Sequence, residues 1–496
     1  MNRKVLVTVL ALGFVFAGCA APAHNGENDN YIYEPVESNL PFPQQAGITY
    51  VNRVMPSTRT QAQMNQDVID QFKKIMQDFL IEPNTPNSNN SEHFRMALSH
   101  QSGGGASKGQ ITCSESMGYG MLMLAYMAGA DEHFRNNSIS NQNLKVVGDR
   151  QLTIKCYFDG MFRSLMNWPT TQGTQISGKR YLMAWELVTD TAGGSWRNTG
   201  SSASSATDGD LDMAYALLLA DKQWGSDGRY NYRDYALKMI QSMWNDIVDR
   251  SNNSYHLKVG NWAGTGASGS SRVSRPSDFM LGHLRTYKAV DTANDWQAVI
   301  NATNNIIGQI TNQQNPVNGL LPGFVILNRS TGIWTPNQSG QNGGAWNESA
   351  ASDHRYDWNA CRVPWRLGTD ILVYGDSNIQ YGPAPLKNIT LGNTCIKPLY
   401  EFLLRGSTNA GGAGNSFSAV SRNHFMDGTG AATGAGSAYS SPVALAAAAY
   451  GTPSEMESAW SYMRNLSRQN NQYGDYINVL CMIAASGNWW APELRN

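Results

Sequence analysis

The chain has 496 residues and a formal net charge of −1, with 37 Lys and Arg against 38 Asp and Glu. With this balance the chain has no excess of positive charge that would attract nucleic acid, so a nucleic-acid partner is not expected. Aromatic residues make up 10% of the chain, including 14 Trp and 22 Tyr. Rings in such numbers either pack in a core or form platforms on which sugar rings stack.

The N-terminus has the pattern of an export signal. Arg3 and Lys4 precede an apolar run, Val5–Phe16, which is too short to remain a membrane-spanning helix, and Cys19 follows two small residues. This resembles a bacterial lipoprotein signal, in which the cysteine is acylated; an ordinary cleaved signal is the alternative. We predict a signal peptide over residues 1–18, export, and a lipid anchor on the periplasmic or cell-surface face of a bacterial membrane.

Two further segments complete the predicted domain organisation. Residues 19–50 lack hydrophobic periodicity and are expected to form a flexible tether. Residues 51–496 are expected to form one domain, because helices directly follow the Gly- and Ser-rich run Ser407–Ser441, which is therefore an elaborate loop and not a linker.

The cysteines and histidines give no support for a disulfide framework or a metal site. Apart from Cys19 the cysteines are odd in number and widely spaced, so at most two disulfides could form. The chain has no CxxC or HExxH motif and only 8 His, so we expect neither a metal nor a cofactor. The five cysteines are Cys113, Cys156, Cys361, Cys395 and Cys481.

Apolar residues recur at helical spacing in twelve segments. These are Gln61–Leu80, Met117–Ala128, Phe158–Met166, Asp210–Ala220, Tyr232–Val248, Asp278–Ala289, Trp296–Ile310, Val363–Val373, Ile396–Leu404, Val443–Tyr450, Ser454–Leu466 and Tyr476–Ala485. Long segments rich in Gly, Ser and Asn join them. Regular helices with loops of this length favour a single all-α toroid whose loops build a groove at one end.

Three charged segments are candidates for chemistry. Glu115 begins an apolar helix, where an ordinary first-turn glutamate is also favoured by the helix dipole. In a second helix start, Thr207 or Asp208 can cap the helix and Asp210 can complement its dipole, so these residues have structural explanations too. The third segment, DHRYDWNACRVPWR (353–366), concentrates charge and aromatic surface in a chain that is only 15% charged.

The stretch ATDGDLDMAYALLLADKQW, residues 206–224, closely resembles the signature of glycoside hydrolase family 8. The blocks SESMGYGMLMLAYMAG, YLMAW, SRPSDFM and NACRVPWRLGTD resemble further blocks of this family and occur in its order. The resemblance covers about residues 51–491. It implies an (α/α)6 barrel that hydrolyses β-1,4-linked polysaccharides with inversion, using an acid and a base about 6.5–9.5 Å apart.

The resemblance also implies roles for individual residues. Glu115 matches the general acid, and Asp208 matches the carboxylate that holds the sugar at the point of cleavage. Trp185 matches a stacking ring, and Arg362 matches an arginine on the base side of the site. The other expected substrate-binding residues are Tyr119, Asn359, Asp278 and Trp262.

The general base departs from the best-known family pattern. Many members carry aspartate at the position of Asn359, and a neutral amide cannot take a proton from water. The chain thus resembles a subgroup of chitosanases and lichenases whose base is a loop glutamate, and Glu348 is the glutamate of that loop. Asp357 and Asp353 are the alternative bases; Asp357 could instead pair with a nearby arginine.

Physical chemistry sets a requirement for each of the two matched acids. Glu115 needs a raised pKa to act near neutral pH, although a helix N-terminus lowers it, so burial or a neighbouring carboxylate such as Asp208 is required. Asp208 needs to stay ionised to accept sugar hydroxyls and to support positive charge on the ring.

The substrate is expected to be a β-glucan, with chitosan and xylan as the alternatives. Endo action is expected because nothing obvious in the sequence blocks one end of a groove, although a loop such as Gly340–Ser352 could do so. A monomer is expected. A different class of protein remains open, since an exported chain rich in aromatic residues could be a surface glycan-binding lipoprotein whose Asn359 marks lost catalysis.

Overall fold

The computed structural model describes residues 37–81, 97–98, 110–131, 153–188, 197–200, 203–264, 269–338, 353–382, 386–405, 416–467 and 472–495. The predicted signal peptide, Cys19 and Glu348 lie outside these ranges. No helix within them is long and apolar enough to cross a bilayer.

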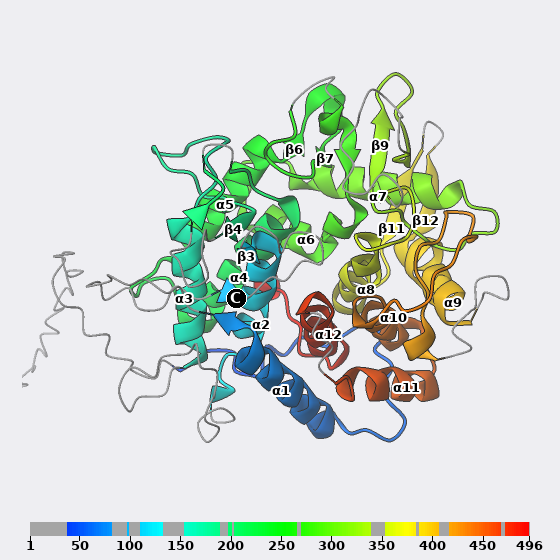
Figure 1. Ribbon diagram of the computed structural model, residues 1–496, viewed down its shortest axis with the longest axis horizontal. Coiled ribbons are helices and arrows are strands. Elements are labelled where there is room, and N and C mark those ends of the chain that lie inside the picture. Colours follow the sequence, from blue (N-terminus) through cyan, green and yellow to red (C-terminus); the bar gives the residue numbers. More distant parts are fainter. Residues whose placement is uncertain are drawn as a thin grey trace, which may run out of the picture.

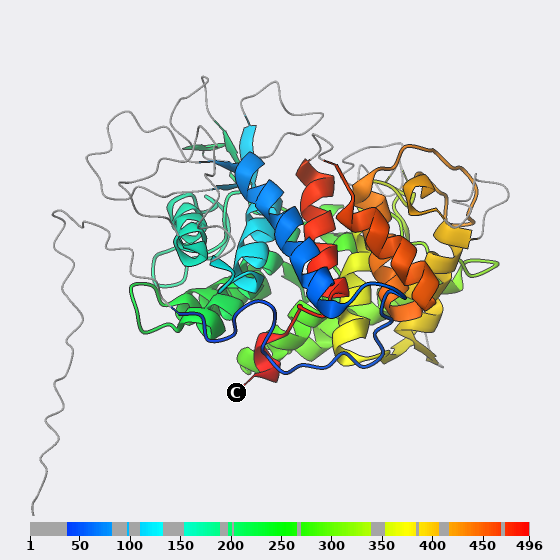
Figure 2. The same ribbon diagram turned by 90° about the horizontal axis from the view of Figure 1, so that it is seen from below.

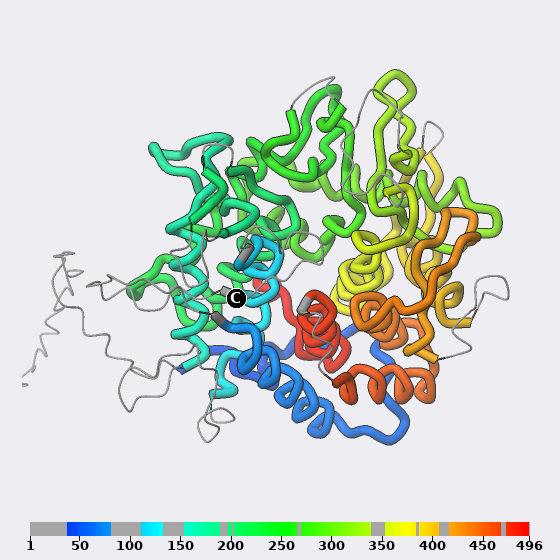
Figure 3. Tube along the Cα trace, viewed as in Figure 1, coloured from blue at the N-terminus to red at the C-terminus, as the bar shows by residue number. Residues whose placement is uncertain are grey.

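The helices of the described residues form two concentric rings (Figures 1 and 3). Each inner helix contacts the next, and α12 closes the ring against α2. The inner helices are α2 (Ser114–Tyr126), α4 (Thr207–Trp224), α6 (Leu281–Val290), α8 (Val363–Tyr374), α10 (Ser437–Tyr450) and α12 (Gln472–Ala485). The outer helices are α1 (Gln61–Asp78), α3 (Ile154–Asn167), α5 (Tyr232–Asp246), α7 (Trp296–Asn312), α9 (Lys397–Arg405) and α11 (Pro453–Arg464). The twelve predicted helices and the (α/α)6 barrel are thus confirmed.

Burial explains which helices lie inside. In α2 every residue except Glu115 is buried, and α10 is buried over most of its length. A helix that is apolar on all sides must be enclosed by other elements. The outer helix α1 instead buries a single stripe that includes Val68, Phe72 and Ile75, so it covers the inner ring with one face.

Short antiparallel strands lie in the loops between the helices. The two-stranded sheets are β1 (Leu80–Ile81) with β2 (Ala97–Leu98), β6 (Val248–Asp249) with β7 (His256–Leu257), and β11 (Asn378–Tyr381) with β12 (Lys387–Thr390). The three-stranded sheets have the orders β3 (Gln110–Cys113), β4 (Glu186–Val188), β5 (Arg197–Asn198) and β10 (Ile333–Pro336), β9 (Val325–Asn328), β8 (Val273–Ser274). Strands of two to four residues are too short for alternating hydrophobicity to reveal them.

The segment over residues 37–54 crosses the C-terminal ends of the inner helices (Figure 2, dark blue). Backbone N–H groups of Asn39, Phe42, Val51 and Val54 donate to carbonyls at the ends of α4, α2, α8 and α10 respectively. Phe42 and Ala46 are buried. The prediction of a flexible tether up to residue 50 is therefore wrong for its described part. The segment is held both by hydrogen bonds to carbonyls at the helix ends and by apolar side chains, such as Phe42 and Tyr50, that join the core.

Candidate active site

Two glycines bring the N-terminal halves of α2 and α4 into close contact. A Cβ on Gly209 would overlap the backbone of Ser114, and a Cβ on Gly118 would lie 2.6 Å from the Cβ of Asp212. The contact places Glu115 and Asp208, in the first turns of their helices, on the same face of the barrel. Close approach of the two helices is thus a condition for the site.

Replacing Gly209 with alanine is expected to destabilise the fold. The added methyl group forces α2 and α4 apart, and overpacking of this kind costs about 1–3 kcal/mol of unfolding free energy. Gly368→Ala is the matched control, because a Cβ at Gly368 in α8 meets no atom closer than 3.9 Å. Denaturant unfolding checks both variants. A Gly209→Ala protein as stable as the control would contradict the packing argument.

Five charged side chains alternate in sign across the site. Arg362, in the short helix that precedes α8, donates Nη1–H to Glu115 Oε1 and, at 2.9 Å, to Asp208 Oδ2. Arg275 Nη2 lies 3.0 Å from Asp208 Oδ1, and its Nε donates to both oxygens of Asp278 at 3.0 and 3.1 Å. The order is Glu115, Arg362, Asp208, Arg275, Asp278. All except Glu115 are nearly fully buried, so each charge requires its neighbours.

Glu115 has the environment that the sequence argument required. Burial raises the pKa of its carboxyl, Arg362 lowers it, and Asp208 raises it, with a net rise. Tyr119 Oη donates to Oε1 at 2.7 Å, the same oxygen that accepts from Arg362. Oε2 has no hydrogen-bond partner among the described residues and is therefore the oxygen that can carry the proton. The side chain is 18% exposed, so a ligand can reach it.

Asp208 has the opposite property. Burial raises its pKa, but Arg275, Arg362 and the backbone N–H of Gly209 outweigh this and lower the pKa to about 2. The pKa of Asp278 differs from that of Asp208. Burial raises the pKa of Asp278 to about 7, although Arg275 opposes the rise. The cluster therefore keeps Asp208 ionised beside Glu115, a carboxyl whose raised pKa makes it the easier of the two to protonate.

The predicted capping of α4 is wrong. Ala206 occupies the N-cap position without a side-chain cap, and Thr207 Oγ1 donates to the carbonyl of Lys258 at 2.5 Å. Asp210 lies in the first turn of α4 as predicted, but burial raises the pKa of its carboxyl well above the usual range and so opposes the charge that would complement the helix dipole. The hydroxyl of Thr207 thus makes a tertiary hydrogen bond to Lys258 in place of the local cap that the sequence spacing predicted.

Asn359 lies beside the cluster. Arg362 Nη2 donates to Asn359 Oδ1 at 3.0 Å, so the amide occupies the position from which a carboxylate would face the same arginine. Asp357 points elsewhere. It accepts from Tyr439 Oη at 2.5 Å and from Arg422 Nη1 at 3.2 Å. Its ion pair is thus with Arg422, which the sequence did not suggest, while the arginines near it in sequence have other partners.

Exposed tryptophans occur next to the charged residues. Trp185 is 40% exposed, and its backbone carbonyl accepts from the N–H of Ser114, the neighbour of Glu115. Trp358 is 43% exposed and directly precedes Asn359. Trp262 is half-buried against a small apolar cluster that includes Phe324. Exposed flat rings beside a polar site suit the apolar faces of sugars.

The structure therefore brings Glu115, Asp208, Asp278, Arg362 and Asn359 together, with Tyr119 bonded to the first of them. Sequence reasoning missed three further residues. They are Arg275, Trp358 and Tyr473, whose ring lies 5.8 Å from the Arg362 guanidinium. Arg275 belongs to the block SRPSDFM, three residues before Asp278, and Trp358 belongs to residues 353–366, directly before Asn359. Their positions next to expected site residues could have identified both. Glu348 lies outside the described residues.

Comparisons with known proteins identify the family of this chain. The sequence pattern of the glycosyl hydrolases family 8 matches residues 152–378. A beta-glucanase of Niallia circulans is 31% identical over 91% of this chain and 91% of its own length, and an endoglucanase of Bacillus sp. strain KSM-330 is 28% identical over 99% and 94%.

Solved structures agree as well. The apo beta-1,3-1,4-glucanase from Paenibacillus sp. X4 superposes with a TM-score of 0.69 at 29% identity, covering 91% of this chain and 99% of its own. A cold-adapted family 8 xylanase, 16% identical, shares the fold with a TM-score of 0.63 over 89% of this chain and 98% of its own. With its barrel, its ordered blocks and these relatives, the chain belongs to glycoside hydrolase family 8.

Proposed function

We propose that the protein is an inverting endo-acting hydrolase of β-1,4 linkages in a β-glucan. The observation that carries this is the pairing of a protonatable Glu115 with an ionised Asp208, both held by Arg362 at a solvent-accessible point beside exposed Trp185. The names of three similar proteins, a beta-glucanase, an endoglucanase and a beta-1,3-1,4-glucanase, favour a glucan as substrate.

Glu115 would act as the general acid. With Oε1 held by Tyr119 and Arg362, the proton on Oε2 passes to the glycosidic oxygen as the C1–O bond breaks. The ionised Asp208 stabilises the positive charge that develops on the ring, and Arg275 and Arg362 hold its carboxylate in place.

Water would complete the reaction from the opposite face of the sugar. Its oxygen bonds to C1 while a carboxylate takes its proton, and the new reducing end has the α configuration. We assign this base to Glu348, because Asn359 cannot accept a proton and Asp357 is already bonded to Tyr439 and Arg422. The assigned base thus precedes the position of Asn359 in the sequence and does not occupy it.

Asp208→Asn should alter both rate and pH dependence. The loss of charge stabilisation is expected to lower kcat about 10²–10³-fold. Asp208 raises the pKa of Glu115, and Glu115 is active in its protonated form, so activity is lost as pH rises through that pKa. Removing the negative charge should move this alkaline limb to lower pH. A lower kcat with an unmoved limb would contradict the coupling of the two carboxyls.

The substrate is tested by measuring reducing-end release on lichenan, carboxymethylcellulose, chitosan and xylan. We expect turnover of lichenan or carboxymethylcellulose, with a rapid fall in viscosity that marks endo action. Faster turnover of chitosan or xylan would replace the glucan assignment. Binding of all four without turnover would instead support a glycan-binding lipoprotein.

We further propose that Cys19 carries a lipid and that the enzyme is an exported monomer. The described chain begins on the face formed by the C-terminal ends of the inner helices, where Asn39 bonds to Gln223. Glu115 and Asp208 lie at the opposite, N-terminal ends. The site and the start of the described chain therefore lie on opposite faces of the barrel. Metabolic labelling with palmitate, lost in Cys19→Ala, tests the anchor.

A further inference from the structure

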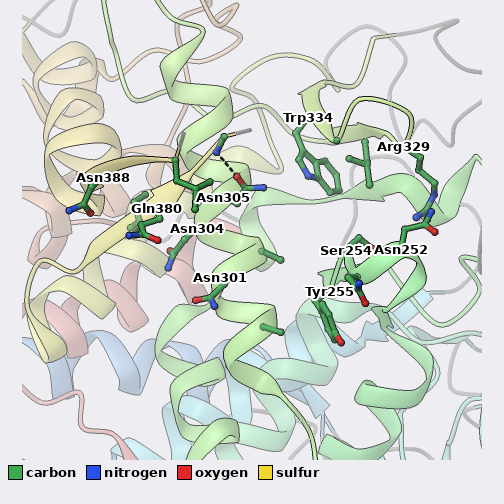
Figure 4. A pocket seen from close by; sticks show the side chains of 18 of the residues that line it. Asn252, Ser254, Tyr255, Asn301, Asn304, Asn305, Arg329, Trp334, Gln380 and Asn388 are labelled. Atoms are coloured by element: carbon green, nitrogen blue, oxygen red, sulfur yellow. Dashed lines mark hydrogen bonds between the residues drawn. The ribbon is translucent and has the colours of Figure 1, made fainter. Parts of the chain in front are cut away.

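A second polar groove lies on the outer ring (Figure 4). Its volume is about 840 Å³, within the range of roughly 300–1,000 Å³ that is usual for ligand pockets. It lies between one face of α7, the turn between β6 and β7, and the β9–β10 and β11–β12 hairpins. None of the charged residues of the active site lines it.

The side of the groove formed by α7 repeats a simple pattern. Ala298, Asn301, Ala302 and Asn305 are spaced at three and four residues, so they share one face of the helix. The alanines leave room for a ligand, and the asparagines supply amides. Gln297 Nε2 donates to Asn301 Oδ1 at 2.8 Å, and the N–H of Gly382 donates to Asn305 Oδ1 at 2.8 Å. Because these contacts hold the oxygens, the NH₂ ends are left to donate to a ligand.

Further amides face the groove from other elements. Asn304 in α7 is 8% exposed, and its Oδ1 has no hydrogen-bond partner among the described residues. Gln380 and Asn388 come from the opposite hairpin (Figure 4). An amide offers both a donor and an acceptor, which matches the neighbouring hydroxyls of a sugar.

Aromatic surface completes the lining. Half-buried Tyr255, in the turn between β6 and β7, and Trp334 of β10, which is only 4% exposed, both line the groove (Figure 4). Tyr255 has a φ of 47°, in the left-handed region that a tyrosine rarely adopts. Backbone strain of this kind persists where the surroundings fix it, often at ligand sites. Amides together with aromatic rings are the two contacts that carbohydrates use.

The charge of the groove limits the ligand further. Among the described residues that line the groove, the only charged one is Arg329, and its Nη2 donates to Asp249 at 2.7 Å. These described residues include no carboxylate to bind a polycation, and their one guanidinium is already paired, so an anion gains little. A neutral ligand with many hydroxyl groups fits this surface.

We propose that this groove is a second binding site for a neutral β-glycan chain, apart from the catalytic cluster. The choice of a β-glucan as occupant rests on the proposed function. The sheet β10–β9–β8 joins the two sites, since Trp334 of β10 lines the groove and Arg275 directly follows β8. A polysaccharide held in the groove would keep the enzyme on its substrate between cleavages.

The test compares a double variant, Asn301→Ala/Gln380→Ala, and a blocking variant, Ala302→Trp, with Gln241→Ala, which removes an exposed amide of α5 outside the groove. Retention in native gels that contain lichenan is measured in a Glu115→Gln background, which prevents digestion. Both groove variants should weaken retention about tenfold, the loss expected for one or two hydrogen bonds, while the control behaves like the parent. With Glu115 intact, kcat/KM for a short gluco-oligosaccharide should change less than about twofold, whereas lichenan turnover falls.

The outcomes separate this inference from the proposed function. Equal retention of all variants, with lichenan still cleaved, would overturn the groove and leave the function standing. Weakened retention of the groove variants without turnover of any glycan would support the groove and overturn the function. Groove-dependent retention by xylan and not by lichenan would overturn the glucan as occupant. Thermal unfolding of each variant shows that the fold is kept.

Discussion

Glu115→Gln is expected to lower kcat on lichenan about 10²–10⁴-fold, the contribution typical of a general acid. The amide keeps the size of the side chain and its contacts with Tyr119 and Arg362, so KM should change little. The pKa of Glu115 is raised mainly by burial, and activity requires the protonated form. The alkaline limb of the pH profile should therefore disappear in any residual activity.

The matched control for this result is Glu401→Gln, which makes the same substitution in α9 at a side chain that is 45% exposed. It should leave kcat and the pH profile unchanged. Wild-type turnover in Glu115→Gln, or an alkaline limb at its original pH, would remove Glu115 from the role of acid.

Glu348→Gln is expected to reduce kcat by a similar factor of about 10²–10⁴, because water can no longer lose its proton. Asp357→Asn is the control. Its carboxylate is 6% exposed and bonded to Tyr439 and Arg422, so the substitution should affect stability more than the chemical step. Azide attacks without losing a proton and should restore turnover in Glu348→Gln, with a glycosyl azide as product.

The reverse ranking of the two variants would contradict the assignment of the base. If Asp357→Asn abolished turnover at unchanged stability while Glu348→Gln remained active, the carboxylate beside Asn359 in sequence would be the base after all. Thermal unfolding of both proteins separates loss of folding from loss of chemistry.

The helices were the most predictable part of the molecule. The inner helices α2 and α10 and the amphipathic helix α1 all carry long apolar patterns, and such patterns depend only on residues near in sequence. The site was partly predictable for the same reason, because Glu115 and Asp208 start helices that the family blocks mark. Their raised and lowered pKa values follow the physical requirement of each role.

Features that depend on distant partners could not be read from local spacing. Arg422, the partner of Asp357, lies 65 residues further along the chain. The N-cap of α4 was predicted incorrectly because Thr207 bonds to Lys258, which belongs to a different loop. Residues 37–54 were expected to include a tether because their apolar side chains have no helical or strand period, while their backbone bonds to carbonyls of four helices that are distant in sequence.

The arrangement of the inner ring unites these observations. Glu115, Asp208 and Arg362 occupy the N-terminal starts of α2, α4 and α8, where helix dipoles favour negative charge. The ionised form of Asp208 is stabilised by this field and by the guanidiniums of Arg275 and Arg362. Glu115 lies in the same field, and burial and the charge of Asp208 overcome it.

The most direct test of the account is the anomeric configuration of the first product, followed by proton NMR during lichenan hydrolysis. Attack by water on the face opposite the leaving group predicts that the α-anomer of the new reducing end appears first and then mutarotates toward the β-anomer. Initial appearance of the β-anomer would show that configuration is retained and would contradict the proposed mechanism.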